Sequence, residues 1–464
     1  MTASVEPRTT IVRGGDVVTM GPTRRVLRGG SVAFSGDVIV GVGSTSELAA
    51  LFPDADVVDA SGCIVTPGLV NAHQHFTGDP LVRCCIPDDV TSDVAIFEWA
   101  VPVHGAHTSI DDGVAAAVTA VEAVSNGVTT LVEAGTVGDA DAVVAAMTDV
   151  GVRGTIGVWG WDVEDGPFAA PADEVLDRQR AIVEHYPAGG LVEGWVTLVG
   201  HDLASDELFA GAADLSRELG TGLSFHMSPS SSDAESYLQR TGKRPLVHLD
   251  DLGVLGRNVL VGHGVWLDDA EVDIVLDRDV AVASCPWAYL RLAQGITRAG
   301  RHAELIERGG RVALGCDAHN AGDAVDILRT AALLAGLAKD RAGDPTRLGA
   351  DQAFALATIE GARAIGLADR IGSIEVGKQA DLVVHRTDVP GGFPVGDLAH
   401  HLIWGTDGRT VRDVFVAGRR IVDDGHVITV DVVALRAEAD VRRAALIERA
   451  GITPHHRWPD VDAG

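Results

Sequence analysis

Apolar runs of strand length alternate with amphipathic stretches through the middle of the chain, from about residue 66 to residue 373. In segments such as 110–126 and 325–339 the apolar residues recur every three or four positions, which predicts helices with one buried face. The apolar runs between the helices end near His73, Val132, Val158, Val199, His226, His263, Ser284 and Cys316. Eight strands alternating with helices predict an α/β fold of the (β/α)8 TIM barrel type.

Both ends of the chain have a different pattern. Short runs rich in β-branched residues, separated by Gly and Pro, occur at residues 10–13, 16–20, 30–34 and 38–42, and again at 380–385 and 411–422. Such runs are typical of short strands joined by turns. We therefore predict a small composite β-sandwich domain built from both chain ends. The predicted units are residues 1–65 (sandwich, first part), 66–373 (barrel), 374–430 (sandwich, second part) and 431–464 (C-terminal helix and tail).

The composition is that of an ordinary globular protein, with 46% hydrophobic and 22% charged residues, so a large core is expected. The five cysteines show no disulfide spacing, which favours a reducing compartment and predicts a cytoplasmic location. No segment looks like a secretory leader, and no apolar run approaches the roughly 20 residues that cross a bilayer. Neither export nor membrane insertion is predicted.

The formal net charge of -29 limits the class of partner. Phosphate backbones and anionic membrane surfaces would be repelled, so we expect neither nucleic acid nor membrane as a partner. A small neutral molecule fits better as the substrate. Residues 432–450 form an Ala- and Arg-rich amphipathic pattern, and such helices often bury an apolar stripe against a symmetry mate. We therefore predict a homo-oligomer.

Four histidines and one aspartate stand at the ends of predicted strands. His73 and His75 are two residues apart, so the alternation of a strand points both side chains to the same side. His226, His263 and Asp317 end later strands. A single histidine at a strand end is more often a hydrogen-bonded polar residue, but parallel barrel strands bring all five groups to one face. Imidazoles with a carboxylate are typical ligands of a divalent metal ion.

The lead-in Pro-Gly-Leu-Val-Asn-Ala before His73, followed by the order His-x-His, His, His, Asp, closely resembles the amidohydrolase superfamily, specifically its mononuclear branch of deaminases and chlorohydrolases. The resemblance implies that His73, His75, His226 and Asp317 bind one divalent ion per chain, zinc first, with cobalt, manganese or iron as alternatives. It implies that His263 contacts the metal-bound hydroxide or adds a ligand, and that Asp317 is also the general base. No lysine ends strand two or four, where binuclear relatives carry a bridging carbamate.

Further candidates follow from the same comparison. His201, after strand four, is a possible catalytic hydrogen-bond donor, and His319, two residues beyond Asp317, is another candidate catalytic residue. A substrate pocket wall is predicted from three tryptophans at or just past strand ends, which could equally be packing residues. These are Trp159, Trp161 and Trp287. The remaining histidines considered are assigned to loops or surfaces: His104, His107, His248, His302, His400 and His401.

The chain departs from the deaminase pattern after strand five. Deaminases of this branch typically carry a glutamate three residues after the strand-five histidine as a proton shuttle, but here Pro229 follows His226 at that distance. Asp233 and Glu235 come next, at the start of a predicted helix, where capping is the simpler role. Strand seven departs too, because Ser284 stands where many relatives have a histidine.

We therefore predict a metal-dependent hydrolase that cleaves a carbamoyl-type C–N or C–S bond of a small neutral apolar molecule, similar to phenylurea and thiocarbamate hydrolases. Such leaving groups need less help from an acid than ammonia does. The alternative is a deaminase or dechlorinase of an amino- or chloro-substituted N-heterocycle, with its proton shuttle moved to Asp233, Glu235 or His319. A third possibility, a non-enzymatic relative, is disfavoured because the ligand set is intact.

Overall fold

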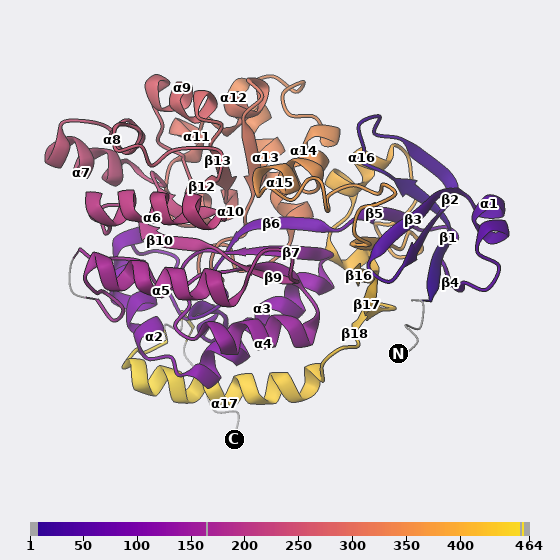
Figure 1. Ribbon diagram of the computed structural model, residues 1–464, viewed down its shortest axis with the longest axis horizontal. Helices are drawn as coiled ribbons and strands as arrows, with labels where there is room; N and C mark the ends of the chain where they lie inside the picture. The colour runs from indigo at the N-terminus through magenta and orange to yellow at the C-terminus, as the bar shows by residue number, and fades with distance from the viewer. Residues whose placement is uncertain (1–7, 164–165, 455–456, 459–464) are drawn as a thin grey trace.

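The computed structural model describes residues 8–163, 166–454 and 457–458, and Figure 1 shows a large α/β body beside a smaller β-rich lobe. The body contains eight parallel strand positions, the fourth of which is split into β9 and β10. They are β6 (Leu69–Gln74), β7 (Val128–Glu133), β8 (Arg153–Ile156), β9 (Val192–Gly194), β10 (Val196–Gly200), β11 (Leu223–Met227), β12 (Val259–His263), β13 (Ala281–Ser284) and β14 (Arg311–Leu314). The strand order follows the chain, and a bridge between Gln74 and Asp317 joins the last position to the first. The predicted (β/α)8 barrel is confirmed.

Helices lie around the strands (Figure 1). In chain order they are η1 (Asp79–Val82), η2 (Val94–Ala100), α2 (Val101–Gly105), α3 (Ser109–Ser125), α4 (Ala140–Val150), α5 (Ala172–His185), α6 (Asp206–Leu219), α7 (Ser231–Thr241), α8 (Pro245–Asp251), α9 (Asp269–Asp277), α10 (Pro286–Arg291), α11 (Ile296–Ala299), α12 (His302–Glu307), α13 (Ile327–Ala342), α14 (Ala350–Leu356) and α15 (Ile359–Ala364). Because every strand runs in the same direction, the loops that follow the strands open on one face of the barrel.

Strands from both chain ends form the smaller lobe. They are β1 (Thr9–Val18), β2 (Val26–Ser35), β3 (Val38–Ser44), β4 (Asp56–Asp59), β5 (Ile64–Pro67), β15 (Leu382–His385), β16 (Val411–Val416), β17 (Arg419–Asp423) and β18 (His426–Val427), with α1 (Thr45–Leu51), α16 (Leu398–His400), η3 (His401–Gly405) and η4 (Gly408–Thr410) alongside. The N-terminal β5 pairs with the C-terminal β15, so one sheet contains both ends. The strands predicted at 10–13 and 16–20 are one strand, β1, with a register shift near Gly15.

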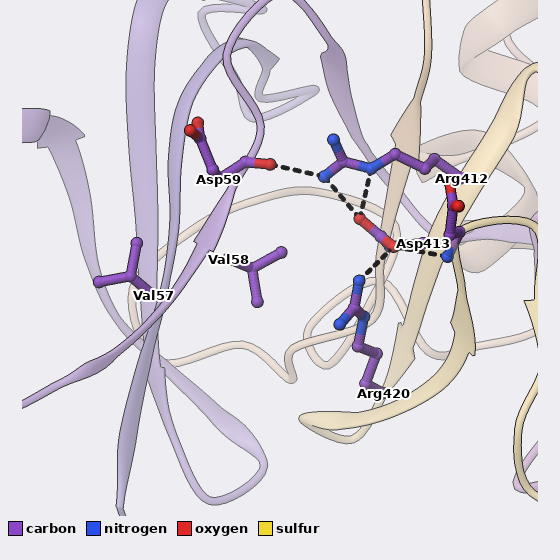
Figure 2. Close-up of a pocket in the computed structure, with 7 residues that line it drawn as sticks. Val57, Val58, Asp59, Arg412, Asp413 and Arg420 are labelled. Atoms are coloured by element: carbon purple, nitrogen blue, oxygen red, sulfur yellow. Dashed lines mark hydrogen bonds and ion pairs between the residues drawn. The ribbon is translucent and has the colours of Figure 1, made fainter.

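A charged network ties the two chain ends together inside this lobe. Figure 2 shows Asp413 of β16 between the guanidinium groups of Arg412 and Arg420, at the edge of a hollow. Arg412 also donates to the carbonyl oxygen of Asp59 in β4 at 2.7 Å. The side chain of Asp413 is fully buried, so its charge depends on both arginines. We assign this hollow a structural role.

The predicted C-terminal helix is present as α17 (Val432–Ala450), which runs along the outside of the barrel (Figure 1). It packs against α3 and η1 of its own chain. Arg442 donates to Asp111 of α3 at 2.7 Å, and Arg449 contacts the same carboxylate. Within the described residues, no helix combines the length and apolar character needed to cross a membrane.

Candidate metal centre

Four predicted metal ligands meet at the carboxyl end of the barrel strands. His73 and His226 lie in β6 and β11, His75 directly follows β6, and Asp317 stands three residues after the end of β14. His75 Nε2 lies 3.3 Å from His226 Nε2 and 3.3 Å from Asp317 Oδ1. His73 Nε2 lies 3.9 Å from the same carboxylate oxygen. The nitrogen and oxygen atoms therefore surround one common point.

Hydrogen bonds fix the direction of the imidazole lone pairs. His226 Nδ1 donates to the carbonyl oxygen of Val199 at 2.7 Å, so Nε2 of the neutral ring carries the lone pair. That lone pair faces His75 Nε2, while His73 Nε2 has no hydrogen-bond partner among the described residues. A buried acceptor without a partner, such as His73 Nε2, is costly, and a divalent cation bound among these atoms removes that cost. The donor set therefore fits a metal ion.

The electrostatics of His73, His226 and Asp317 agree with this arrangement, whereas, despite burial, the hydrogen bond to Asp317 and its charge raise the pKa of His75. Burial alone would raise the pKa of Asp317, but the hydrogen bond from His75 and the neighbouring imidazoles hold it well below its usual range. Burial lowers the pKa of His73 and of His226 well below the ordinary histidine value. Neutral imidazoles and an ionised carboxylate are the forms that bind metal.

Strained backbone and two glycines allow this close approach. His263 has φ of 82° and Asp317 has φ of 66°, in the left-handed region that residues other than glycine rarely adopt. Such strain is concentrated at functional sites. A Cβ at Gly262 would lie 2.8 Å from Cε1 of His73, and a Cβ at Gly315 would lie 2.7 Å from the Cβ of His73. The His73 ring therefore fits only because these two positions lack side chains.

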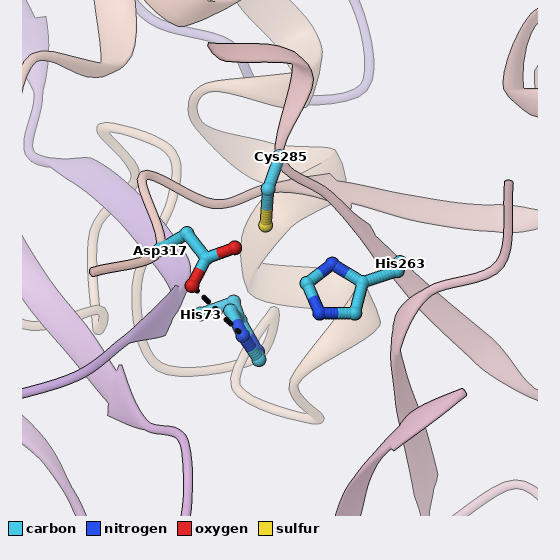
Figure 3. Close-up of side chains that lie close together, drawn as sticks. All are labelled: His73, His263, Cys285 and Asp317. Atoms are coloured by element: carbon cyan, nitrogen blue, oxygen red, sulfur yellow. Dashed lines mark ion pairs between the residues drawn. The ribbon is translucent and has the colours of Figure 1, made fainter. Parts of the chain in front are cut away.

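His263 lies beside the four predicted ligands. The sequence analysis predicted that this residue contacts the metal-bound hydroxide or is an additional ligand. Its ring centroid is 5.0 Å from that of His73, and its Nδ1 has no partner among the described residues. Burial lowers the pKa of His263 to about 4. Figure 3 shows the thiol of Cys285 pointing into the same space, within 4.8 Å of ligand atoms of His73, His263 and Asp317. The sequence reasoning assigned no site role to Cys285.

His201 forms a hydrogen-bonded pair with Asp233 at the edge of the cluster. His201 Nδ1 lies 2.9 Å from Asp233 Oδ2, and the same oxygen accepts from the backbone N–H of Ser228 at 2.6 Å. The His201 ring stacks beside the His226 ring, with centroids 5.6 Å apart. Glu235, by contrast, is exposed on α7. Of the two carboxylates that follow Pro229, only Asp233 is directed toward the metal ligands.

A second carboxylate supports the ligands from behind and was not predicted. Glu133, at the end of β7, accepts hydrogen bonds from the backbone N–H of Thr136 at 3.2 Å and from its hydroxyl group at 3.3 Å. The Thr136 hydroxyl group in turn hydrogen bonds to His75 Nδ1 at 2.8 Å, which orients the imidazole toward the metal. Burial raises the pKa of Glu133 to about 7. The loop that follows Glu133 contains no sequence motif that indicates this role.

An aromatic cluster lines the same end of the barrel. Trp159 stacks on Phe168 with ring centroids 5.1 Å apart and lies edge-on to His104 at 5.1 Å. Trp161 lies 5.6 Å from Trp159, and the indole N–H groups of both have no partner among the described residues. Val199, whose carbonyl oxygen holds His226, belongs to this cluster. The prediction that His104 is a loop or surface residue is wrong, because the ring is buried against Gly78.

The structure places the other predicted candidates outside the cluster. His319 is buried, and its Nε2 hydrogen bonds to Glu122 of α3 at 3.1 Å. Glu122 also pairs with Arg83, and despite burial these partners lower its pKa to about 2. His319 therefore anchors the loop after β14 to α3. Trp287 lies under the guanidinium of Arg329, at 5.1 Å, and does not join the other two tryptophans.

Comparison with known proteins assigns the family. A model of the amidohydrolase family matches residues 64–421, and the chain belongs to that family. It is a metal-dependent hydrolase that uses a single divalent metal ion. Its fold is that of an adenosine deaminase from Xanthomonas campestris with bound zinc, at a TM-score of 0.90 and 29% identity, covering 96% of this chain and 99% of that structure.

Two curated relatives are named as deaminases of adenine nucleosides. A 5-methylthioadenosine/S-adenosylhomocysteine deaminase from Syntrophobacter fumaroxidans is 30% identical over 424 residues, 90% of this chain and 94% of the relative. A 5'-deoxyadenosine deaminase from Methanosarcina acetivorans is 28% identical over 451 residues, 95% of this chain and 99% of the relative.

These relatives correct the main functional prediction. Cleavage of a carbamoyl C–N or C–S bond is wrong, and so is the placement with phenylurea and thiocarbamate hydrolases. The error came from treating Pro229 as the loss of a proton donor. The fold brings Asp233 and His201 to the cluster, although they are 32 residues apart in sequence. The predicted alternative, deamination of an amino-substituted heterocycle, agrees with the relatives.

Proposed function

We propose that this enzyme is a hydrolytic deaminase of an adenine nucleoside or a closely related amino-purine compound. The observation that carries the proposal is the cluster of His73, His75, His226 and Asp317 with the His201–Asp233 pair at its edge. The names of the relatives supply the substrate class. The reaction replaces an amino group with oxygen, consuming one water and releasing ammonia.

His73, His75, His226 and Asp317 would hold the metal ion. When bound, the ion acts as a Lewis acid and lowers the pKa of water toward neutrality. Asp317 is ionised and lies next to the ligands, so Asp317 is the group placed to accept a proton from the attacking water. His263 reaches the same point from β12 and is placed to hydrogen bond to the attacking oxygen.

The His201–Asp233 pair would supply the proton that the ring nitrogen and the leaving amino group require. Asp233 holds the Nδ1 edge of the imidazole and leaves Nε2 of His201 free to face the substrate. This is the arrangement in which a carboxylate orients an imidazole for proton transfer. The pair thus takes the place of the glutamate that Pro229 excludes.

The aromatic cluster would receive the neutral part of the substrate. Trp159 and Trp161 present flat apolar faces with unpaired N–H donors, which suits a heterocycle or sugar that carries acceptor atoms. Trp287 is not included in this wall. We also propose a cytoplasmic enzyme, in keeping with five free thiols, and the homo-oligomer stays a prediction.

The test is to measure ammonia release by zinc-loaded protein from adenosine, 5'-deoxyadenosine, 5-methylthioadenosine and S-adenosylhomocysteine. We expect turnover of at least one, with the corresponding hypoxanthine product. No ammonia from any of the four, together with turnover of a chloro-substituted triazine, would contradict the proposal.

A further inference from the structure

A cavity lies on the outside of the barrel. It has a volume of about 330 Å³ and lies between α11, α12 and α13. This volume is within the range of small-molecule sites. Its apolar wall is formed by Ile296, Leu334, Leu337 and Ala338, and its polar wall by Arg301, His302, Glu304, Arg341 and Arg347.

Arginines gather in this cavity although the molecule as a whole is acidic. The chain carries 66 acidic and 37 basic residues, yet three arginines and one glutamate line the cavity. Arg301 pairs with Asp269 and Glu304, and Arg347 pairs with Glu307, whereas Arg341 forms no ion pair within the described residues. Arg341 is exposed, its Nη1 donates to the carbonyl oxygens of Ile296 and Gly300, and its other N–H groups have no protein partner within the described residues. A guanidinium in this state is suited to a carboxylate or phosphate.

The inner wall of the cavity is connected to the metal centre. His302 is 2% exposed, and its Nε2 donates to the carbonyl oxygen of His263 at 2.6 Å. Its Nδ1 has no partner within the described residues. The ring stacks on Tyr289, whose hydroxyl group lies 3.4 Å from the same carbonyl oxygen and equally far from that of Ala283, so it can donate to either. Both contacts hold the strained backbone of His263, so the prediction that His302 is a loop or surface residue is wrong.

We propose that this cavity binds a small organic anion, and that occupancy changes the catalytic rate by shifting His302 and, with it, His263. The anionic head, a carboxylate or a phosphate, pairs with Arg341. The apolar body packs against Leu334 and Leu337. The bound anion contacts His302 in the cavity wall and shifts its ring. This shift changes the hydrogen bond from His302 Nε2 to the carbonyl oxygen of His263. This regulatory site is separate from the proposed substrate pocket.

Binding is tested by calorimetry on the zinc-loaded full chain with benzoate and phenyl phosphate, which distinguish the two head groups, and with benzyl alcohol as the neutral match. We expect saturable binding of at least one anion and none of the alcohol. Arg341→Gln should weaken binding by about tenfold to hundredfold, the effect of losing a charge-assisted hydrogen bond. Ala338→Phe should abolish binding by filling the cavity, and Arg436→Gln on exposed α17 should leave it unchanged.

Coupling is tested on cobalt-loaded protein by adding the bound anion and recording the visible absorption spectrum and the rate of deamination. We expect a shifted spectrum and a changed kcat, both absent in Arg341→Gln. Binding that survives Arg341→Gln and Ala338→Phe would mean that the anion sits on the metal, and would overturn the site. Binding with an unchanged spectrum and rate would overturn the coupling. Calorimetry and the absorption spectrum need no substrate. Their results therefore do not depend on whether the proposed deaminase activity is correct.

Discussion

Asp233 is the carboxylate on which the proposed proton transfer depends. Its Oδ2 accepts from both His201 and Ser228, so it fixes the imidazole without contacting the metal ligands directly. Asp233→Asn should lower kcat by about 10²-fold or more, with a small change in KM and full metal content. Steady-state kinetics with a metal assay measure all three quantities.

The matched control for Asp233 is Glu235→Gln, two residues along the same helix but exposed. It should keep the wild-type kcat. A purely structural role for Asp233 would lower the melting temperature and leave kcat per folded molecule unchanged, so the pH dependence of kcat is recorded as well. If Asp233→Asn keeps both the rate and the pH profile, another group donates the proton.

Gly262 determines whether His73 can take its place in the cluster. A Cβ at position 262 would approach the His73 ring to 2.8 Å, against backbone that cannot move far within a buried strand. Gly262→Ala should therefore lower zinc affinity and activity together. Gly336→Ala in α13 is the control, because nothing lies within 4 Å of its Cβ and helix propensity favours alanine by about 0.5–1 kcal/mol. If Gly262→Ala and Gly336→Ala bind zinc equally tightly, the space beside the His73 ring does not depend on Gly262.

The four residues proposed to hold the metal could be identified from the sequence because each stands at or just after a strand end, where barrel geometry decides the direction of the side chain. The pair proposed to donate the proton could not be identified in this way. Asp233 belongs to a helix start whose simplest role is capping, and only tertiary structure brings it to His201. The roles of Glu133 and His302 likewise depend on partners distant in sequence, Glu133 acting through Thr136 on His75.

Helix α17 is held to the barrel through one buried carboxylate. Asp111 is fully buried, pairs with Arg442 and Arg449 of α17, and also caps α3 through Thr108. Asp111→Asn leaves two arginines without their counter-charge, so the free energy of unfolding should fall by about 3 kcal/mol. Chemical denaturation measures this change. The control Arg436→Gln, on the exposed face of α17, should stay within about 0.5 kcal/mol of wild type; a similar loss there would remove the special role of Asp111.

At the level of elements, the barrel strands were predictable because buried parallel strands are continuous apolar runs. The π-helix η2 and the short helix α2, which carries His104, were not predicted. Their sequence has no clean helical period, and their conformation depends on packing over the barrel mouth. One face of α17 packs against α3, and the expected contact of α17 with a symmetry mate stays a prediction.

The stability of the whole molecule should depend on pH through His385 in the smaller lobe. This ring is buried between Thr66 and Thr410, and burial lowers its pKa from 6.5 to about 4. The unfolded chain therefore binds a proton more readily, so the stabilisation is complete above pH 6.5 and is lost as the pH falls through 4. The loss amounts to about 3 kcal/mol.

Replacing His385 with Gln should flatten the fall in unfolding free energy between these two pH values, as measured by urea denaturation at each pH. Exposed His426→Gln serves as the control and should follow the wild-type curve. A His385→Gln protein with the same acid sensitivity as wild type would show that other groups dominate.

The enzyme is proposed to deaminate an adenine nucleoside with one zinc ion held by His73, His75, His226 and Asp317. The most direct measurement is ammonia release from 5'-deoxyadenosine, with zinc content determined on the same preparations of wild type and His226→Ala. The account predicts one zinc per chain and steady ammonia release for wild type, and loss of both in the variant, because an open ligand position no longer retains the ion. A His226→Ala protein that keeps its zinc and its rate, or a zinc-loaded wild type that releases no ammonia from any adenine nucleoside, would contradict it.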